Sequence, residues 1–419
     1  MAESVSQLPR QSLFGLNAAN FLQAEMVGVI LPILNCLLKQ SGWRYDSLGV
    51  ATAVGGLGTL IFQTPAGWLT DRLRCRRAIF AAAAIFVGGC FVAIPVVPRV
   101  PVWIDSLLFA SGAAGSFFGP LLAALALALV GHAGFNRTMG SNQGWNHAGN
   151  IAAALLSMAI VSAFGLSAVF YSVGLGSLLA AASMVLIRPR DLDERVATGL
   201  TRNEPVEPSW KHLLHNRAVL FLFLAIFLFH LANAPILPTV ALYVKKLGGS
   251  DNLMTATVLT AQLVMVPVAL AAGRLCDRWG PKPVMAIAFW ALPLRILSYT
   301  LARSPAAVVW LQGLDGIGAG IYGVAVAVFS ADLTRGKGGF NTLMGLLATA
   351  LAFGGVAGPI LSGLLLQHLG FRTTFYAFAL LAAAGGTLFT VLVPGRAAAA
   401  GRTSAAALVA QASSANPRP

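Results

Sequence analysis

The chain contains a succession of apolar segments that are each long enough to cross a lipid bilayer as a helix. Of its 419 residues, 57% are hydrophobic and 10% are charged, whereas about 25% of the residues of a soluble protein are charged. A helix needs about 20 apolar residues to span the hydrocarbon core. Because lipid offers no partner to backbone groups and these runs lack the alternation of barrel strands, we expect an all-α membrane protein with twelve transmembrane helices. The segments lie near residues 12–38, 48–69, 77–97, 104–131, 142–165, 167–188, 217–244, 252–273, 283–302, 307–332, 342–367 and 373–394.

The composition argues against several other classes of protein. The net charge is +14, but the basic residues are scattered over short loops, so no nucleic-acid partner is expected. The four cysteines show no spacing typical of a metal or redox site, and we expect neither a metal nor a cofactor. The sequence has no phosphate-binding glycine loop and no soluble domain for a catalytic site, so it predicts neither ATP hydrolysis nor an enzyme.

A charged motif recurs once in each half of the chain. Residues 67–72 read Gly-Trp-Leu-Thr-Asp-Arg and residues 273–278 read Gly-Arg-Leu-Cys-Asp-Arg, at an offset of 206. Residues 134–140 and 339–345 share Gly-Phe-Asn and Met-Gly at an offset of 205. The chain is therefore two copies of one unit.

This motif, which follows the second apolar segment of each half, resembles the signature loop of the major facilitator superfamily. The resemblance extends over residues 12 to 394. It implies two pseudo-symmetric six-helix bundles that rock around a central cavity. In that family the Asp of the motif caps or pairs with a neighbouring helix end, and the basic residues hold helices together on the cytoplasmic side in one state. The resemblance therefore implies a conformational latch that comprises Gly67, Asp71, Arg72, Gly273, Asp277 and Arg278.

The sequence departs from the pattern usual in proton-antiport exporters of that superfamily. Its fourth segment has no Arg followed by Gln-Gly, and a Gly-Pro element lies in the eleventh segment, at residues 358–359, instead of the fifth. The resemblance therefore implies transport more firmly than it implies export.

Basic residues indicate the orientation in the membrane. Apart from the intramembrane Arg295, the side with the N-terminus, both motif loops and the connector between the halves carries 20 Lys and Arg, and the other side carries 7. Because basic loops stay in the cytoplasm, both termini are expected there. The expected parts are a cytoplasmic N-terminus (1–11), an N-terminal six-helix bundle (12–188), a cytoplasmic linker (189–216), a C-terminal six-helix bundle (217–394) and a disordered cytoplasmic tail (395–419).

Titratable groups inside the apolar segments are candidates for proton coupling, because a charge at the bilayer centre costs about 3 kcal/mol or more. Glu25 lies in the middle of the first segment and is the predicted proton site, with a structural hydrogen bond to a neighbouring helix as the alternative. Arg295 and Asp315 lie at similar depth on adjacent segments, so we expect them to pair, either as a coupling device or as a permanent bridge. His230, in the seventh segment, lies in the region equivalent to that of Glu25 and is a further candidate.

Uncharged polar residues indicate the substrate cavity. Asn142, Asn146 and Asn150 form one polar face of the fifth segment, which either lines the central cavity or bonds to a neighbouring helix. Trp145 would supply a ring face, and His147 is either a proton carrier or a hydrogen-bonded histidine. The predicted cavity residues are Asn17, Asn20, Gln63, Asn142, Trp145, Asn146, His147, Asn150, Asn233, Gln262 and Gln312.

These features together predict a secondary active transporter of a small organic solute that works by alternating access. We expect proton coupling and export, as in a drug or metabolite:proton antiporter. The alternatives are a proton-coupled importer of a small polar solute and a non-transporting membrane sensor of the same fold. The expected partners are the lipid bilayer, the solute and protons. We expect a monomer in the plasma membrane, namely the inner membrane of a bacterium.

Overall fold

The structure consists of helices. A computed structural model describes residues 9–28, 30–43, 45–200, 213 and 215–394, and this part of the chain contains no β-strand. The helices of the first half are α1 (Arg10–Gly28), α2 (Ile30–Gln40), α3 (Tyr45–Arg72), α4 (Arg76–Ala93), α5 (Pro101–Gly115), α6 (Phe118–Phe164) and α7 (Leu166–Leu186). Two short 3-10 helices follow, η1 (Pro189–Asp191) and η2 (Val196–Thr198). The helices of the second half are α9 (Arg217–Asn233), α10 (Ile236–Lys246), α11 (Asp251–Trp279), α12 (Pro281–Tyr299), α13 (Pro305–Leu311), α14 (Gly313–Thr334) and α15 (Phe340–Leu392).

These helices make the predicted twelve crossings. Within the described residues, seven helical stretches are long and apolar enough to cross a membrane, judged by length and composition. Two of them, Pro101–Phe164 and Phe340–Leu392, contain 64 and 53 residues, far more than the roughly 20 that one crossing needs. Each reverses its direction at a glycine with positive φ, Gly131 at 65° and Gly370 at 74°. Each of these stretches therefore supplies two crossings, so the seven stretches make nine. The other three crossings are α3, α12, and α1 together with α2.

The repeat predicted from the sequence is visible in the backbone. Gly165 and Gly370 are 205 residues apart, and they connect the last two crossings of their halves. Their φ/ψ values are 81°/174° and 74°/176°. A side chain disfavours positive φ, so glycine is the residue suited to both turns.

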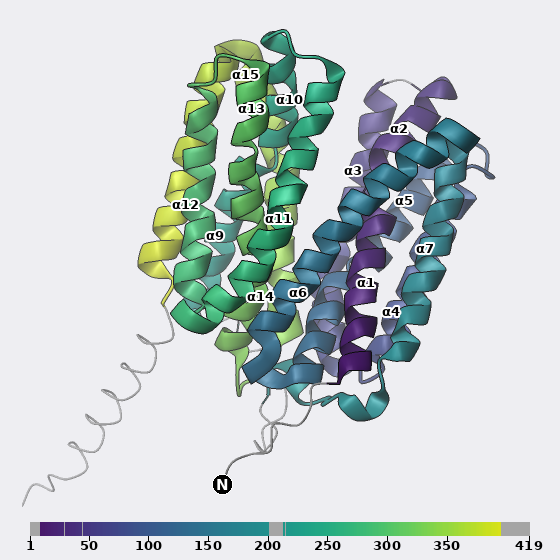
Figure 1. The fold of residues 1–419 in the computed structure, drawn as a ribbon, viewed down its shortest axis with the longest axis vertical. Coiled ribbons are helices and arrows are strands. Elements are labelled where there is room, and N and C mark those ends of the chain that lie inside the picture. Colours follow the sequence, from purple (N-terminus) through teal and green to yellow (C-terminus); the bar gives the residue numbers. More distant parts are fainter. Residues whose placement is uncertain (1–8, 29, 44, 201–212, 214, 395–419) are drawn as a thin grey trace, which may run out of the picture.

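The two halves form two bundles that stand side by side (Figure 1). Helices α1 to α7 make the first bundle and α9 to α15 make the second. We call the side on which α1 begins and α15 ends the terminal side, at the bottom of Figure 1, and the opposite side the distal side. The bundles meet along two junctions, where α6 packs against α11 and α3 packs against α15.

Each bundle buries apolar side chains inside and presents others outside. In the second bundle, the ring of Phe289 lies between those of Phe229 and Phe389, with centroid distances of 4.9 and 4.6 Å. On the outside, Phe164 and Leu301 are 78% and 79% exposed. Apolar surface of this kind is costly in water but is solvated by lipid.

The predicted start of the fifth segment is wrong. The sequence places a loop at residues 132–141, but α6 resumes directly after Gly131. The glycines and polar residues of this stretch resemble a loop, yet they form helical turns that reach the other bundle. In the second half the equivalent loop does exist: Gly336, Gly338 and Gly339 have positive φ, and α15 begins only at Phe340. The two halves therefore differ at this position.

The first part of the hydrophilic linker is packed against the bundles. Val196, Ala197 and Thr198 in η2 are buried. Residues 201–212 of the linker and the predicted disordered tail, 395–419, lie outside the described residues.

Candidate functional site

The Asp71 carboxylate joins the two bundles on the terminal side. It accepts hydrogen bonds from the backbone N–H groups of Asn341 and Thr342 at 3.1 and 2.7 Å. It also accepts from the Asn341 amide at 2.9 Å and the Thr342 hydroxyl at 2.6 Å. The first N–H groups of a helix lack partners within it, and a capping side chain normally satisfies them. Because the N-cap residue Gly339 makes no such bond, Asp71 caps α15 from the other bundle.

The equivalent Asp277 makes a weaker junction. Its carboxylate accepts from the Asn136 amide at 2.9 Å and pairs with the Arg137 guanidinium at 2.8 Å. The side chain of Arg137 is 76% exposed and that of Asp277 is 28% exposed. Because the helix resumes at Gly131, the N–H groups of Asn136 and Arg137 lie beyond its first turn and are bonded within α6. In the described part of the chain, Asp277 therefore binds side chains and no backbone N–H group.

The basic residues of the two motifs have different surroundings, and their role in the latch stays a prediction. Arg72 lies over the ring of Trp68 on its own helix, at 4.2 Å from the ring centroid, and Arg278 is exposed on α11. The residues that bind the two motif carboxylates, Asn341 and Arg137 among them, were not predicted as site residues. The shared Gly-Phe-Asn of the two halves is the sequence signal that could have indicated them.

Glycines allow the bundles to touch at the terminal side. Gly67 lies directly against the backbone carbonyl of Asn341. A Cβ added to Gly273 would lie 2.5 Å from the carbonyl oxygen of Asn136, and one added to Gly140 would lie 2.8 Å from that of Ala269. No larger residue fits at such distances without a backbone shift. The terminal side is therefore closed.

The second bundle contains a cavity of about 170 Å³ with charged groups in its wall. Its lining includes His230 and Asn233 from α9, Arg295 from α12, and Asp315 and Tyr322 from α14. Arg295 forms the predicted ion pair with Asp315 and donates to the Asn233 side-chain oxygen at 2.8 Å. The Arg295 side chain is 3% exposed, and its Nε has no hydrogen-bond partner among the described residues. Such a buried charge is stable only because its partners are held in place.

Gln312 belongs to a neighbouring contact. Its side-chain oxygen accepts from the Tyr299 hydroxyl at 2.7 Å, while its Nε2 is buried and makes no hydrogen bond with any residue that the structure describes. Gln312 therefore lies near the Arg295 pair but does not line the cavity.

The asparagine face of α6 bonds to α1. Asn146 donates to the backbone oxygen of Asn20 at 3.3 Å and to the side chain of Gln23 at 3.1 Å. Asn150 donates to Asn146 at 3.5 Å. Asn142 is buried, and within the part of the chain that the structure describes its Nδ2 and Oδ1 atoms have no hydrogen-bond partner. Of the two alternatives, the structure shows the interhelical bonding, whereas contact with a substrate stays a prediction.

The other predicted residues of the first bundle make different contacts. Asn17 accepts from Ser141 at 3.3 Å, and Trp145 is 44% exposed. Gln63 donates to a carbonyl of its own bundle at 3.5 Å instead of reaching across the bundles. Glu25 lies in α1, but its side chain is outside the described part of the structure.

Polar side chains also connect the bundles at greater depth. His147 Nδ1 and Gln262 Oε1 are 3.0 Å apart, which joins α6 to α11. The hydroxyls of Thr64 and Thr349 are 2.7 Å apart, which joins α3 to α15. His147 therefore acts here as a hydrogen-bonded histidine.

Comparison with known proteins shows the same organisation. The family profile described as Major Facilitator Superfamily matches residues 13–292 and 222–415. An uncharacterised MFS-type transporter of Mycobacterium tuberculosis is 35% identical over 402 residues, which cover 94% of this chain and 96% of the relative. The multi-drug resistance efflux pump PmrA of Streptococcus pneumoniae is 23% identical over 86% of this chain and 90% of the pump. The structure of the proton:xylose symporter XylE aligns with a TM-score of 0.72 at 13% identity, over 92% of this chain and 96% of that chain.

Proposed function

Because the chain belongs to the major facilitator superfamily of membrane transporters, we propose that it exports a small organic solute in exchange for protons. Membership itself makes the protein a multi-pass membrane transporter of small molecules and not an enzyme. The direction of transport, the coupling ion and the location in a bacterial inner membrane with cytoplasmic termini are parts of the proposal.

The main support for alternating access is the closure between the bundles on the terminal side. Asp71, Asp277 and the glycine contacts join them on the terminal side. These contacts consist of hydrogen bonds, one exposed ion pair and touching backbones, all of which can separate without unfolding either bundle. With cytoplasmic termini, this state is closed to the cytoplasm. Rocking of the bundles would then expose the central site to either side.

The second bundle offers a place for part of the solute. The cavity combines a polar group of His230, Asn233, Arg295 and Asp315 with apolar walls such as Leu292. A few fixed polar groups within a mainly apolar lining are typical of small-molecule sites. The Arg295–Asp315 pair is also suited to coupling, because a proton on Asp315 would leave a buried guanidinium unpaired and change which state is stable.

Export is favoured by a relative. The pump PmrA, which matches most of this chain, is named as a multi-drug resistance efflux pump. The cavity also lacks a surplus of one charge, as expected for a site that accepts varied organic solutes.

The experiment uses purified protein in proteoliposomes with a pH-sensitive dye inside. Addition of a transported solute should move protons in the wild type. We expect Glu25→Gln, which resembles the protonated acid, to bind solute but to lose the accumulation driven by a pH gradient. Asp105→Asn, an acid near the distal end of α5, is the matched control and should retain accumulation. If Glu25→Gln still concentrates solute against its gradient, Glu25 is not the coupling site.

A further inference from the structure

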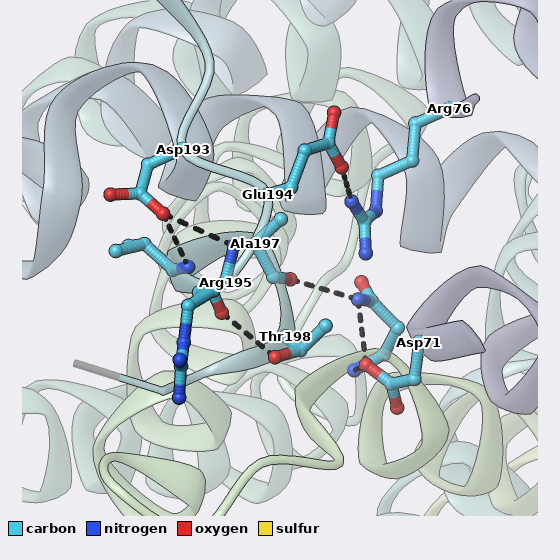
Figure 2. A network of polar contacts seen from close by, with 9 residues as sticks. Asp71, Arg76, Asp193, Glu194, Arg195, Ala197 and Thr198 are labelled. Carbon is cyan, nitrogen blue, oxygen red and sulfur yellow. Dashed lines mark hydrogen bonds and ion pairs between the residues drawn. The ribbon is translucent and has the colours of Figure 1, made fainter. Parts of the chain in front are cut away.

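The connector after α7 crosses the terminal side from one bundle to the other. We call residues 188–200 the strap. Although it belongs to a stretch rich in charged residues, Val196, Ala197, Thr198 and Leu200 are 5% exposed or less. Asp193 accepts from the N–H groups of Arg195 and Val196 at 3.1 and 3.2 Å, which fixes the turn of η2 (Figure 2). The strap is therefore packed against the bundles and is not a flexible linker.

The strap is fixed to the first bundle by a buried charge and a backbone bond. Glu194 pairs with Arg76, the first residue of α4 (Figure 2), whose side chain is only 2% exposed. The N–H of Asp193 donates to the carbonyl of Ala128 in α6 at 3.1 Å. Among the described residues, the Nε of Arg76 is buried without a hydrogen-bond partner. Removal of Glu194 would therefore take away the ion-pair partner of a buried guanidinium and leave the Asp71 carboxylate as the other negative charge near it.

The strap also contacts the second bundle, through hydrogen bonds that two of its carbonyl groups accept. The Asn341 amide donates to the carbonyl of Ala197 at 3.0 Å, and the N–H of Gly336 donates to the carbonyl of Gly199 at 2.9 Å. Gly199 has a φ of +90°, and a Cβ there would lie 3.0 Å from the Thr334 hydroxyl. The strap therefore fits closely against the ends of α14 and α15 in the closed state.

One side chain connects the strap to the latch. The Asn341 amide that donates to Ala197 also donates to Asp71 at 2.9 Å. Asp71 and the strap both belong to the first bundle's surface, whereas Asn341 moves with the second bundle. Separation of the bundles must therefore break both bonds of Asn341 together.

We propose that the strap is a third component of the closed latch and that Glu194 is its positioning residue, acting through Arg76. The ion pair holds the strap in the position at which the carbonyl groups of Ala197 and Gly199 accept hydrogen bonds from the second bundle. When the terminal side opens, the strap stays with the first bundle and releases Asn341 and Gly336. This role rests on the alternating access of the proposed function, but it concerns the balance between states and not the solute or the coupling ion.

The test measures the two states directly by pulsed EPR. Spin labels at the exposed positions Arg10 and Trp279 report the separation of the bundles on the terminal side, after the exposed Cys36 and Cys75 are replaced by serine. In this background, Glu194→Gln should raise the open-to-closed ratio about tenfold, because the buried Arg76 loses its partner while Glu194 is only partly buried. Glu194→Asp keeps a carboxylate and should restore part of the closed population.

Two further variants distinguish an effect of the strap on the two states from a general effect on stability. Gly199→Ala leaves the Arg76 pair intact and should also favour the open state, because it strains the positive φ and crowds Thr334. Arg190→Gln, at a side chain that is 74% exposed, is the matched control in the same segment and should leave the ratio unchanged.

Three results would each overturn the strap proposal. A lower melting temperature with an unchanged ratio in both Glu194→Gln and Gly199→Ala would overturn the proposal, since the strap would then only support the fold. A second such result is a single distance between the two spin labels in the wild type, both with solute and at every pH tested. In that case the proposal of alternating access is wrong, and the proposed role of the strap is wrong with it. If the wild type shows two distances and the variants do not shift them, only the strap proposal is overturned.

Discussion

Asp71 caps a helix of the other bundle, and we expect Asp71→Asn to open the terminal side while both bundles stay folded. The carboxylate binds the N–H groups of Asn341 and Thr342 and both of their side chains. Asparagine offers a single acceptor oxygen, and its NH2 group would face donors of Thr342. The variant therefore loses about half of the contact and also loses the negative charge at the start of α15.

The size of the effect follows from these two losses. Removal of a helix cap costs about 0.5–2 kcal/mol, and a negative charge at a helix N-terminus contributes about 0.3–1 kcal/mol. Together they give about 1–3 kcal/mol. Since 1.4 kcal/mol corresponds to a factor of ten, the open-to-closed ratio should rise about 5- to 150-fold.

Asp277→Asn is the matched control from the repeat. Its carboxylate contacts only side chains, and its ionic partner Arg137 is largely exposed. Exposed ion pairs contribute about 0.2–1 kcal/mol, so this variant should change the ratio about fivefold or less. The two signature motifs are alike in sequence but should differ in effect by about an order of magnitude.

The assay is the same EPR distance between positions 10 and 279, together with transport in proteoliposomes. Transport should slow in Asp71→Asn, because the closed state becomes rarely populated. Equal shifts in the Asp71 and Asp277 variants would refute the capping argument. Unchanged transport in both at wild-type expression would remove the latch assignment altogether.

Two further predictions concern the cavity and the bundle junction. Exchange of the buried charges, Arg295→Asp with Asp315→Arg, should retain more transport than either single neutralisation, because a buried pair broken on one side costs about 3–5 kcal/mol; a double variant no better than the worse single one would show that the charges do not act as a pair. Gly67→Ala should raise the open-to-closed ratio, since its Cβ would collide with a backbone carbonyl of α15, whereas Gly56→Ala on the same helix has no atom within 4 Å of the new Cβ and should have no effect. Identical EPR distances in these two glycine variants would contradict the close-contact argument.

Much of the fold could be predicted from the sequence because lipid imposes strict rules. Apolar length gives the crossings, and the repeated motif gives the two halves. The Arg295–Asp315 pair could also be predicted, because both residues lie at a countable distance from one short loop on adjacent helices. These inferences need only the order of residues along neighbouring helices.

Contacts between distant parts of the chain could not be predicted in this way. Asp71 binds residues 270 and 271 positions away, and no periodicity indicates which helix end lies there. The asparagine face of α6 could line a polar cavity or bond to the polar residues of α1, and the sequence pattern is the same in both cases. Glu194 looks like one of several solvated charges of a linker, and only the packing of η2 shows that it reaches a buried Arg76.

The unequal strength of the two junctions has a consequence for the route of entry and exit. On the terminal side, the α3–α15 junction is capped by Asp71 and covered by the strap, whereas the α6–α11 junction is held by the exposed Arg137 pair, the Asn136 amide and backbone contacts at glycines. The first separation on the terminal side should therefore occur between α6 and α11, with α3 and α15 serving as the pivot. A solute that passes on this side would then meet a lateral opening at one edge of the molecule, although the fold itself has two nearly equivalent edges.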